Sequence, residues 1–127
     1  MKTEQIIEKL DSLNIDDTNE DEMMEEVLNL TIELSKNSDS HLACAAMISL
    51  LERHPKADFG GPGAIVHTLE DHSGHYESLL FESLERQPTE YTVMLLQRII
   101  NGEKDTEKCA ELLKLFKNCA KHPKADK

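Results

Sequence analysis

Histidine and aspartate side chains gather between residues 67 and 75, where the sequence comes nearest to a metal site. On a helix, His67 and Asp71 would lie one turn apart on the same face, and His75 would join them if the helix continued through Gly74. Glycine disfavours that continuation, and the spacing differs from the His-Glu-x-x-His motif. We therefore expect surface histidines beside acidic residues, with no metal and no other cofactor.

Nucleophilic catalysis has little support in the sequence. Cys44 stands in a run of leucine and alanine residues, so its thiol is expected to be buried and unreactive. The serines at positions 73, 78 and 83 lack the glycine-flanked turn that exposes a catalytic serine. Acidic residues are so frequent that no glycosidase-like pair of carboxylates can be singled out. The sequence predicts a protein that is not an enzyme.

A glycine-rich turn, Gly60-Gly61-Pro62-Gly63, precedes a segment with helical periodicity. The first amides of such a helix could hold an anion. A phosphate loop would continue with Gly-Lys-Ser or Gly-Lys-Thr, and this turn does not. We expect it to let two helical segments pack closely.

Negative charge is the strongest surface feature of the sequence. The 127 residues include 25 aspartates and glutamates against 14 lysines and arginines, a net charge of −11, which argues against direct binding to nucleic acid. Residues 1–35 carry two basic and eleven acidic side chains, net −9, whereas residues 91–127 carry eight and five, net +3. The acidic run at residues 16–26 is either a solvated helix face or a docking surface for a basic protein.

We predict a docking surface, with partner-binding residues in two groups. The first group is the acidic run: Asp16, Asp17, Glu20, Asp21, Glu22, Glu25 and Glu26. The second group lies in the middle of the chain: Asp58, Glu70, Asp71, Glu77, Glu90 and Tyr91. Tyr76 and Tyr91 would be anchors if their rings point outward, and half-buried packing residues otherwise.

Apolar residues recur at helical spacing along the whole chain, which predicts an all-α protein. The expected helices span about residues 3–13, 20–36, 39–53, 64–72, 75–86, 88–101 and 105–121. Pro88 is expected to open the sixth helix, Gly102 to end it in a left-handed conformation, and Asp105 to cap the seventh. Leu28 and Leu42 are expected on or beside buried faces.

The helix ends recur with a regular period. Pro55, Pro88 and Pro123 are 33 and 35 residues apart, and the pentapeptide HPKAD occurs at residues 54–58 and again at 122–126. Each period holds two helices, near the repeat length of helical solenoids. We interpret residues 1–127 as one domain, an N-terminal helix followed by helical hairpins at about 20–54, 55–87 and 88–122. A HEAT- or armadillo-like α-α superhelix is the preferred arrangement, and a plain bundle is the alternative.

The central segments resemble small HEAT-like helical proteins of bacteria. The resemblance lies in residues 58–70 (DFGGPGAIVHTLE), 76–80 (YESLL) and 88–102 (PTEYTVMLLQRIING). Some proteins of this type are immunity proteins encoded beside polymorphic or contact-dependent growth-inhibition toxins. The resemblance implies an all-helical fold and a cognate toxin as partner, and it assigns no toxin-contacting residues.

Charge and resemblance together predict an immunity protein that neutralises a cognate bacterial toxin, such as a basic nuclease, by covering its active or substrate-binding surface. A general HEAT-like adaptor for protein–protein interactions is the alternative, and a metal-dependent enzyme using His67, Asp71 and His75 is the third interpretation. The three cysteines form no Cys-x-x-Cys pair, the N-terminus lacks the apolar core of a signal peptide, and no apolar run could span a bilayer. We expect a cytoplasmic protein with reduced thiols that contacts neither nucleic acid nor membrane, and the sequence leaves its oligomeric state open.

Overall fold

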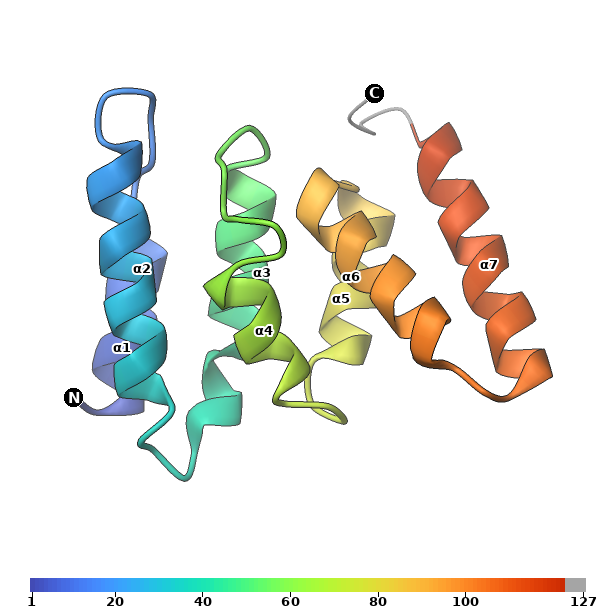
Figure 1. Ribbon diagram of the computed structural model, residues 1–127, viewed down its shortest axis with the longest axis horizontal. Helices are drawn as coiled ribbons and strands as arrows, with labels where there is room; N and C mark the ends of the chain where they lie inside the picture. The colour runs from blue at the N-terminus through green and yellow to red at the C-terminus, as the bar shows by residue number, and fades with distance from the viewer. Residues whose placement is uncertain (123–127) are drawn as a thin grey trace.

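In the computed structural model, which describes residues 1–122, every regular element is a helix (Figure 1). The predicted all-α fold class is confirmed. None of the helices in this part of the chain combines the length and apolar character needed to cross a membrane. The elements are α1 (Thr3–Ser12), α2 (Glu20–Leu34), the 3-10 helix η1 (Ser40–Ala43), α3 (Cys44–Arg53), α4 (Ala64–Glu70), α5 (Glu77–Arg86), α6 (Glu90–Gly102) and α7 (Thr106–Lys121).

The helices form two rows along the longest axis of the molecule. In the view of Figure 1, α2, α4 and α6 lie in front of α1, α3 and α5. Within the rear row α1 contacts α3 and α3 contacts α5, while α2 contacts α4 in the front row. α7 packs against α6. The α1–α2 pair therefore makes one end of the molecule, and α7 makes the other.

The helices pair differently from the hairpins expected at the start of the chain. The main neighbours of α2 are α1 and α4, and those of α3 are α1 and α5. Residues 20–36 and 39–53 are thus neighbours in sequence that pack chiefly against other helices. The last two helices, α6 and α7, pack directly against each other.

Aliphatic side chains fill the space between the two rows. Ile6, Leu34, Leu50, Leu80 and Leu95, from five different helices, are all fully buried. Burying one such side chain is worth about 1.5–3 kcal/mol. The packing of amphipathic faces, rather than helix propensity alone, holds these short helices in place.

The start of α7 follows the sequence prediction. The carboxylate of Asp105 accepts hydrogen bonds from the backbone amides of Glu107 and Lys108, at 2.9 and 3.2 Å. These bonds satisfy two amides that have no partner inside the helix. The predicted stop at Pro123 lies outside the described residues, as does most of the second HPKAD sequence.

Both ends of α6 differ from the prediction. Pro88 does not open the helix, because Thr89 is the N-cap and its hydroxyl accepts a hydrogen bond from the amide of Thr92 at 3.3 Å. Gly102 has no positive φ, and the helix passes into extended backbone at Glu103. A side-chain cap and a change to extended backbone thus replace the proline start and the left-handed glycine stop.

Two leucines expected on or beside buried faces are exposed. Leu42 is 57% exposed because it lies in the 3-10 turn η1, where side chains follow a three-residue repeat instead of the α-helical one. Leu28 is 48% exposed because α2, with α1 and α4 as its main neighbours, buries only one stripe, which includes Val27 and Leu34. The prediction was wrong for both leucines.

Burial of the cysteines gives a testable expectation. Cys44 is fully buried, and desolvation, with a smaller effect of the Glu77 carboxylate, raises the pKa of its thiol to about 11. Burial also raises the pKa of Cys119, whereas Cys109 is only half-buried. Because the thiolate is the reactive form, we expect Cys109 to be the one fast-reacting thiol of the folded protein.

Thiol labelling with a chromogenic disulfide at neutral pH, with and without denaturant, measures this directly. One thiol should react quickly in the folded state, and three should react after unfolding. A C109S variant should lose the fast phase, and persistence of that phase would contradict the assignment.

Candidate functional site

Seven carboxylates lie at the N-terminal end of the molecule, in the turn before α2 and on its first two turns. We call this set the acidic surface: Asp16, Asp17, Glu20, Asp21, Glu22, Glu25 and Glu26. Glu20 and Glu26 are half-buried, and the other five are exposed. Among residues 1–122, no lysine or arginine forms an ion pair with any of the seven. The N-terminal end of the α2 dipole stabilises the charges in its first turn.

Asp16 is used inside the turn itself. Its carboxylate accepts hydrogen bonds from the amides of Thr18 and Asn19 at 2.9 and 3.1 Å, and from the Thr18 hydroxyl. The Asn19 side chain accepts in return from the Asp16 amide at 2.8 Å. Hydrogen bonds from the Thr18 hydroxyl and amide lower the pKa of Asp16, so the carboxyl stays ionised. Asp16 therefore positions the start of α2, and the other six carboxylates remain available.

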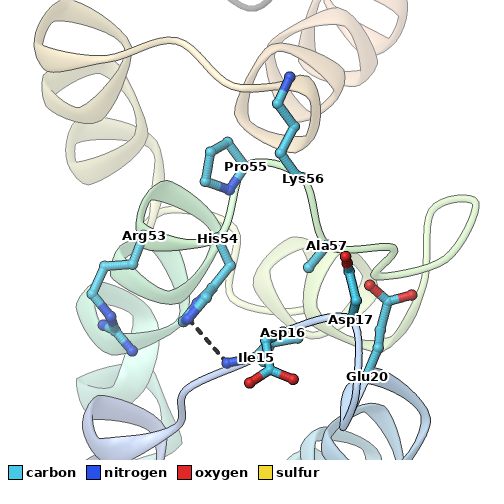
Figure 2. Close-up of a pocket in the computed structure, with 9 residues that line it drawn as sticks. All are labelled: Ile15, Asp16, Asp17, Glu20, Arg53, His54, Pro55, Lys56 and Ala57. Atoms are coloured by element: carbon cyan, nitrogen blue, oxygen red, sulfur yellow. Dashed lines mark hydrogen bonds between the residues drawn. The ribbon is translucent and has the colours of Figure 1, made fainter.

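His54, at the end of α3, holds the loop that leads into the acidic surface (Figure 2). The amide of Ile15 donates a hydrogen bond to Nε2 of His54 at 3.2 Å. Nδ1 of the same ring lies 3.2 Å from the carbonyl oxygen of Leu50, and it donates to that oxygen because Nε2 is the acceptor. A neutral imidazole thus ties residues 39 positions apart and fixes the loop on the protein core.

A pocket of about 240 Å³ lies between this loop and the end of α3. It is lined by the residues drawn in Figure 2: Ile15, Asp16, Asp17, Glu20, Arg53, His54, Pro55, Lys56 and Ala57. Figure 2 shows the carboxylates of Asp17 and Glu20 on one side and the Arg53 side chain on the other, while Lys56 extends away from them.

The Arg53 guanidinium does not neutralise the acidic surface. It donates to the carbonyl oxygen of Leu10 at 3.1 Å and to the hydroxyl of Ser49 at 2.9 Å. Leu10 lies in the last turn of α1, where the negative end of the helix dipole attracts a positive charge. Arg53 therefore joins α1 to α3 and forms no ion pair with the neighbouring carboxylates.

The second group of predicted partner residues is spread over the loop before α4 and over α4, α5 and α6. Glu70 forms a two-pronged ion pair with Arg98, at 2.7 and 2.8 Å. Glu77 accepts a hydrogen bond from the amide of Gly74 at 2.8 Å, which fixes the start of α5. Both carboxylates thus have structural partners. Asp58 is exposed, but its carboxylate also has structural partners, because it accepts from the amide of Gly60 at 3.0 Å and lies 3.2 Å from the hydroxyl of Tyr91. Asp71 and Glu90 are exposed.

The structure corrects the expected role of Tyr91 as an outward anchor. Its side chain is 4% exposed, and its hydroxyl oxygen accepts a hydrogen bond from the amide of Phe59 at 2.9 Å. The same hydroxyl lies 2.9 Å from the carbonyl oxygen of Gly60, to which it donates. Tyr76 is equally buried. Both rings therefore pack in the core and are not presented to a partner.

The residues of the metal interpretation are not gathered into a site. α4 ends just before Asp71, and the positive φ of Gly74 turns the chain before His75. His75 lies against His41 instead, with ring centroids 4.5 Å apart. Throughout residues 1–122, no three histidine, cysteine, aspartate or glutamate side chains are placed to hold a metal ion. His67, Asp71 and His75 therefore do not form the predicted alternative site.

Comparisons of the chain with models of protein families, with curated proteins and with solved structures give no match. What the protein binds is therefore inferred from its own residues and their geometry.

The sequence did not predict the roles of three residues at this end of the molecule: Arg53, His54 and Ile32. The contacts of Arg53 and His54 join residues 43 and 39 positions apart, which no local pattern reveals. Ile32 is 50% exposed on α2. The exposure of an apolar residue on α2 could have been predicted, because the apolar residues of this helix cover more of its circumference than one buried stripe needs.

Proposed function

We propose that this protein is a cytoplasmic immunity protein that binds a cognate bacterial toxin, a basic nuclease, and neutralises it by covering its active or substrate-binding surface. The observation that carries the proposal is the acidic surface. Its carboxylates have no cationic partner among residues 1–122, and they are held by a turn and a histidine contact that fix their positions. Elsewhere Glu33, Glu52 and Glu70 are paired with cations.

The physical basis is electrostatic steering followed by exclusion. Residues 1–35 carry a net charge of −9, which attracts a cationic surface over roughly a Debye length, ~8–10 Å at physiological salt. A nuclease needs a cationic groove to hold its phosphate backbone. Occupation of that groove by carboxylates excludes the nucleic acid without any catalytic step by this chain. The same negative charge disfavours direct binding of this protein to nucleic acid.

Co-expression tests this function in cells. A toxin domain encoded beside the gene should arrest growth when it is expressed alone, and this protein should restore growth. An adaptor would bind the same domain without reducing its toxicity. Continued arrest at equal expression levels would contradict the immunity proposal.

Charge reversal at four exposed positions should slow binding of that toxin domain. We expect the D17K/D21K/E22K/E25K variant to associate about tenfold or more slowly at low salt, because steering contributes factors of 10 to 10³ to association rates. The rate should also depend less on salt concentration. Stopped-flow or surface-based kinetics at several salt concentrations would measure both quantities.

A matched control separates local from global charge. The E82K/E85K/E107K/E111K variant changes the net charge by the same amount at exposed residues outside the acidic surface. Its association rate should fall much less. Equal rates for the two variants would remove the acidic surface from the binding site, and circular dichroism would check that both variants remain helical.

A further inference from the structure

The outer face of α2 carries a stripe that is half acidic and half apolar. Asp21, Glu25, Leu28 and Ile32 are spaced four, three and four residues apart, which keeps them on one side of the helix. Leu28 and Ile32 are 48% and 50% exposed, although most large apolar side chains of this protein are buried. We call these four residues the α2 stripe.

α7 carries on its exposed side a stripe that is half apolar and half basic. Its half-buried apolar side chains pack toward the core, and α6 is its main neighbour. On its exposed side, Ala110, Leu113, Lys117 and Lys121 are spaced three, four and four residues apart. Leu113 is 42% exposed, and neither lysine forms an ion pair among residues 1–122. We call these four residues the α7 stripe.

The two stripes match in spacing and sign. On α2 the apolar pair and the acidic pair are centred about seven residues apart, ~10 Å along the helix. On α7 the apolar pair and the lysine pair are separated by nearly the same length. On α2 the acidic pair precedes the apolar pair in the sequence, whereas on α7 the lysine pair follows the apolar pair. The acidic pair therefore faces the lysine pair, and the two apolar pairs face each other, when the helices run in opposite directions.

The fold places the stripes for such a contact between copies. In Figure 1, α2 and α7 lie at opposite ends of the longest axis, α2 runs down the view, and α7 runs up. Moving one copy along that axis brings its α2 beside the α7 of the next copy, antiparallel to it. The lysine end of α7 then meets the acidic end of α2.

We propose that copies of this chain associate head to tail, with the α7 stripe of one copy against the α2 stripe of the next. Leu113 packs against Leu28 and Ile32, and Lys117 and Lys121 face Glu25 and Asp21. The contact uses different surfaces on the two copies and leaves a free stripe at each end, so it produces an open row that lengthens with concentration. The inference does not depend on the toxin proposal.

Sedimentation velocity across a wide concentration range, with the full chain at low salt, tests the contact. The average mass of the wild-type protein should rise with concentration and fall when salt is added. K117E/K121E and D21K/E25K should each weaken association about tenfold or more, the factor that 1.4 kcal/mol corresponds to. K104E/K108E, which changes the same charge outside the stripe, should behave like the wild type.

The quadruple variant D21K/E25K/K117E/K121E provides the decisive comparison, because it restores opposite charges across the contact. It should recover most of the concentration dependence that each double variant loses. A wild-type protein that stays monomeric at every concentration would overturn the proposal. Equal behaviour of K117E/K121E and K104E/K108E, or no recovery in the quadruple variant, would overturn it as well.

Discussion

Replacing Tyr91 by phenylalanine is expected to lower the free energy of unfolding by about 2 kcal/mol, because a buried amide loses its hydrogen-bond partner. The hydroxyl of Tyr91 accepts from the Phe59 amide at 2.9 Å and lies 3.2 Å from the Asp58 carboxylate. The aromatic rings of Tyr91 and Phe59 also meet edge to face, with centroids 5.3 Å apart. Tyr91 therefore holds the loop before α4 against α6.

Truncation to alanine should cost more. Y91A also removes the ring, and loss of a buried aromatic side chain typically costs 3–5 kcal/mol, so we expect about 4 kcal/mol. Urea unfolding followed by circular dichroism measures both variants.

Tyr76 provides the matched control for the hydroxyl. It is as buried as Tyr91, but its hydroxyl forms no hydrogen bond among residues 1–122. Y76F should therefore leave the free energy of unfolding nearly unchanged. If Y76F and Y91F destabilise equally, the hydrogen bonds of Tyr91 do not stabilise the loop.

Replacing Gly63 by alanine is expected to destabilise the fold by about 3 kcal/mol, through unfavourable backbone conformation and a steric clash. Gly63 has φ +93° and ψ 177°, a region that only glycine adopts readily. A Cβ atom at this position would also overlap the carbonyl oxygen of Phe59. Because the clashing atoms, the carbonyl oxygen and carbon of Phe59, belong to the backbone, a side-chain rotation cannot relieve the clash.

Two other glycines separate these causes. Gly74 also has a positive φ, +95°, but a Cβ there would meet no atom within 4 Å, so G74A should cost about 1 kcal/mol from conformation alone. Gly102 has no positive φ, and a Cβ there would meet no atom within 4 Å, so G102A should be neutral or slightly stabilising. Thermal unfolding of the three variants should rank them G63A, G74A, G102A, from least to most stable. A different order would contradict this explanation of the turn.

The parts of the fold that follow from local chemistry could be predicted from the sequence. Apolar periodicity located the seven α-helices of residues 1–122, and Asp105 is the predicted cap of α7 because its carboxylate reaches amides only two and three residues away. The start of α6 was misplaced because a local signal, Pro88, competed with a better one, the side-chain cap of Thr89. Leu42 was misplaced because a 3-10 turn cannot be distinguished from a short α-helix by apolar spacing.

The acidic surface could also be anticipated, because its residues are neighbours in sequence. The contacts of the residues around it could not be anticipated. Whether Arg53 neutralises these carboxylates depends on contacts with Leu10 and Ser49, and the first of these joins residues 43 positions apart. Tyr91 illustrates the same limit, because its position on an apolar stripe is compatible with either an exposed or a buried ring until the loop that covers it is placed.

Acidic residues therefore have two roles in this protein. Glu52 and Glu70 join helices through Arg86 and Arg98, and these pairs hold neighbouring helices in register. The carboxylates at the start of α2 have no such partners among residues 1–122, and we assign them to the binding of another protein.

Co-purification from the native host tests that assignment most directly. The protein chains retained by the wild type, by D17K/D21K/E22K/E25K and by E82K/E85K/E107K/E111K would be quantified side by side by mass spectrometry. We predict one basic chain that is retained by the wild type and by the second variant and is lost from the first. Retention of the same chains by all three proteins, or retention of an acidic chain other than this protein itself, would contradict the proposed role of the acidic surface.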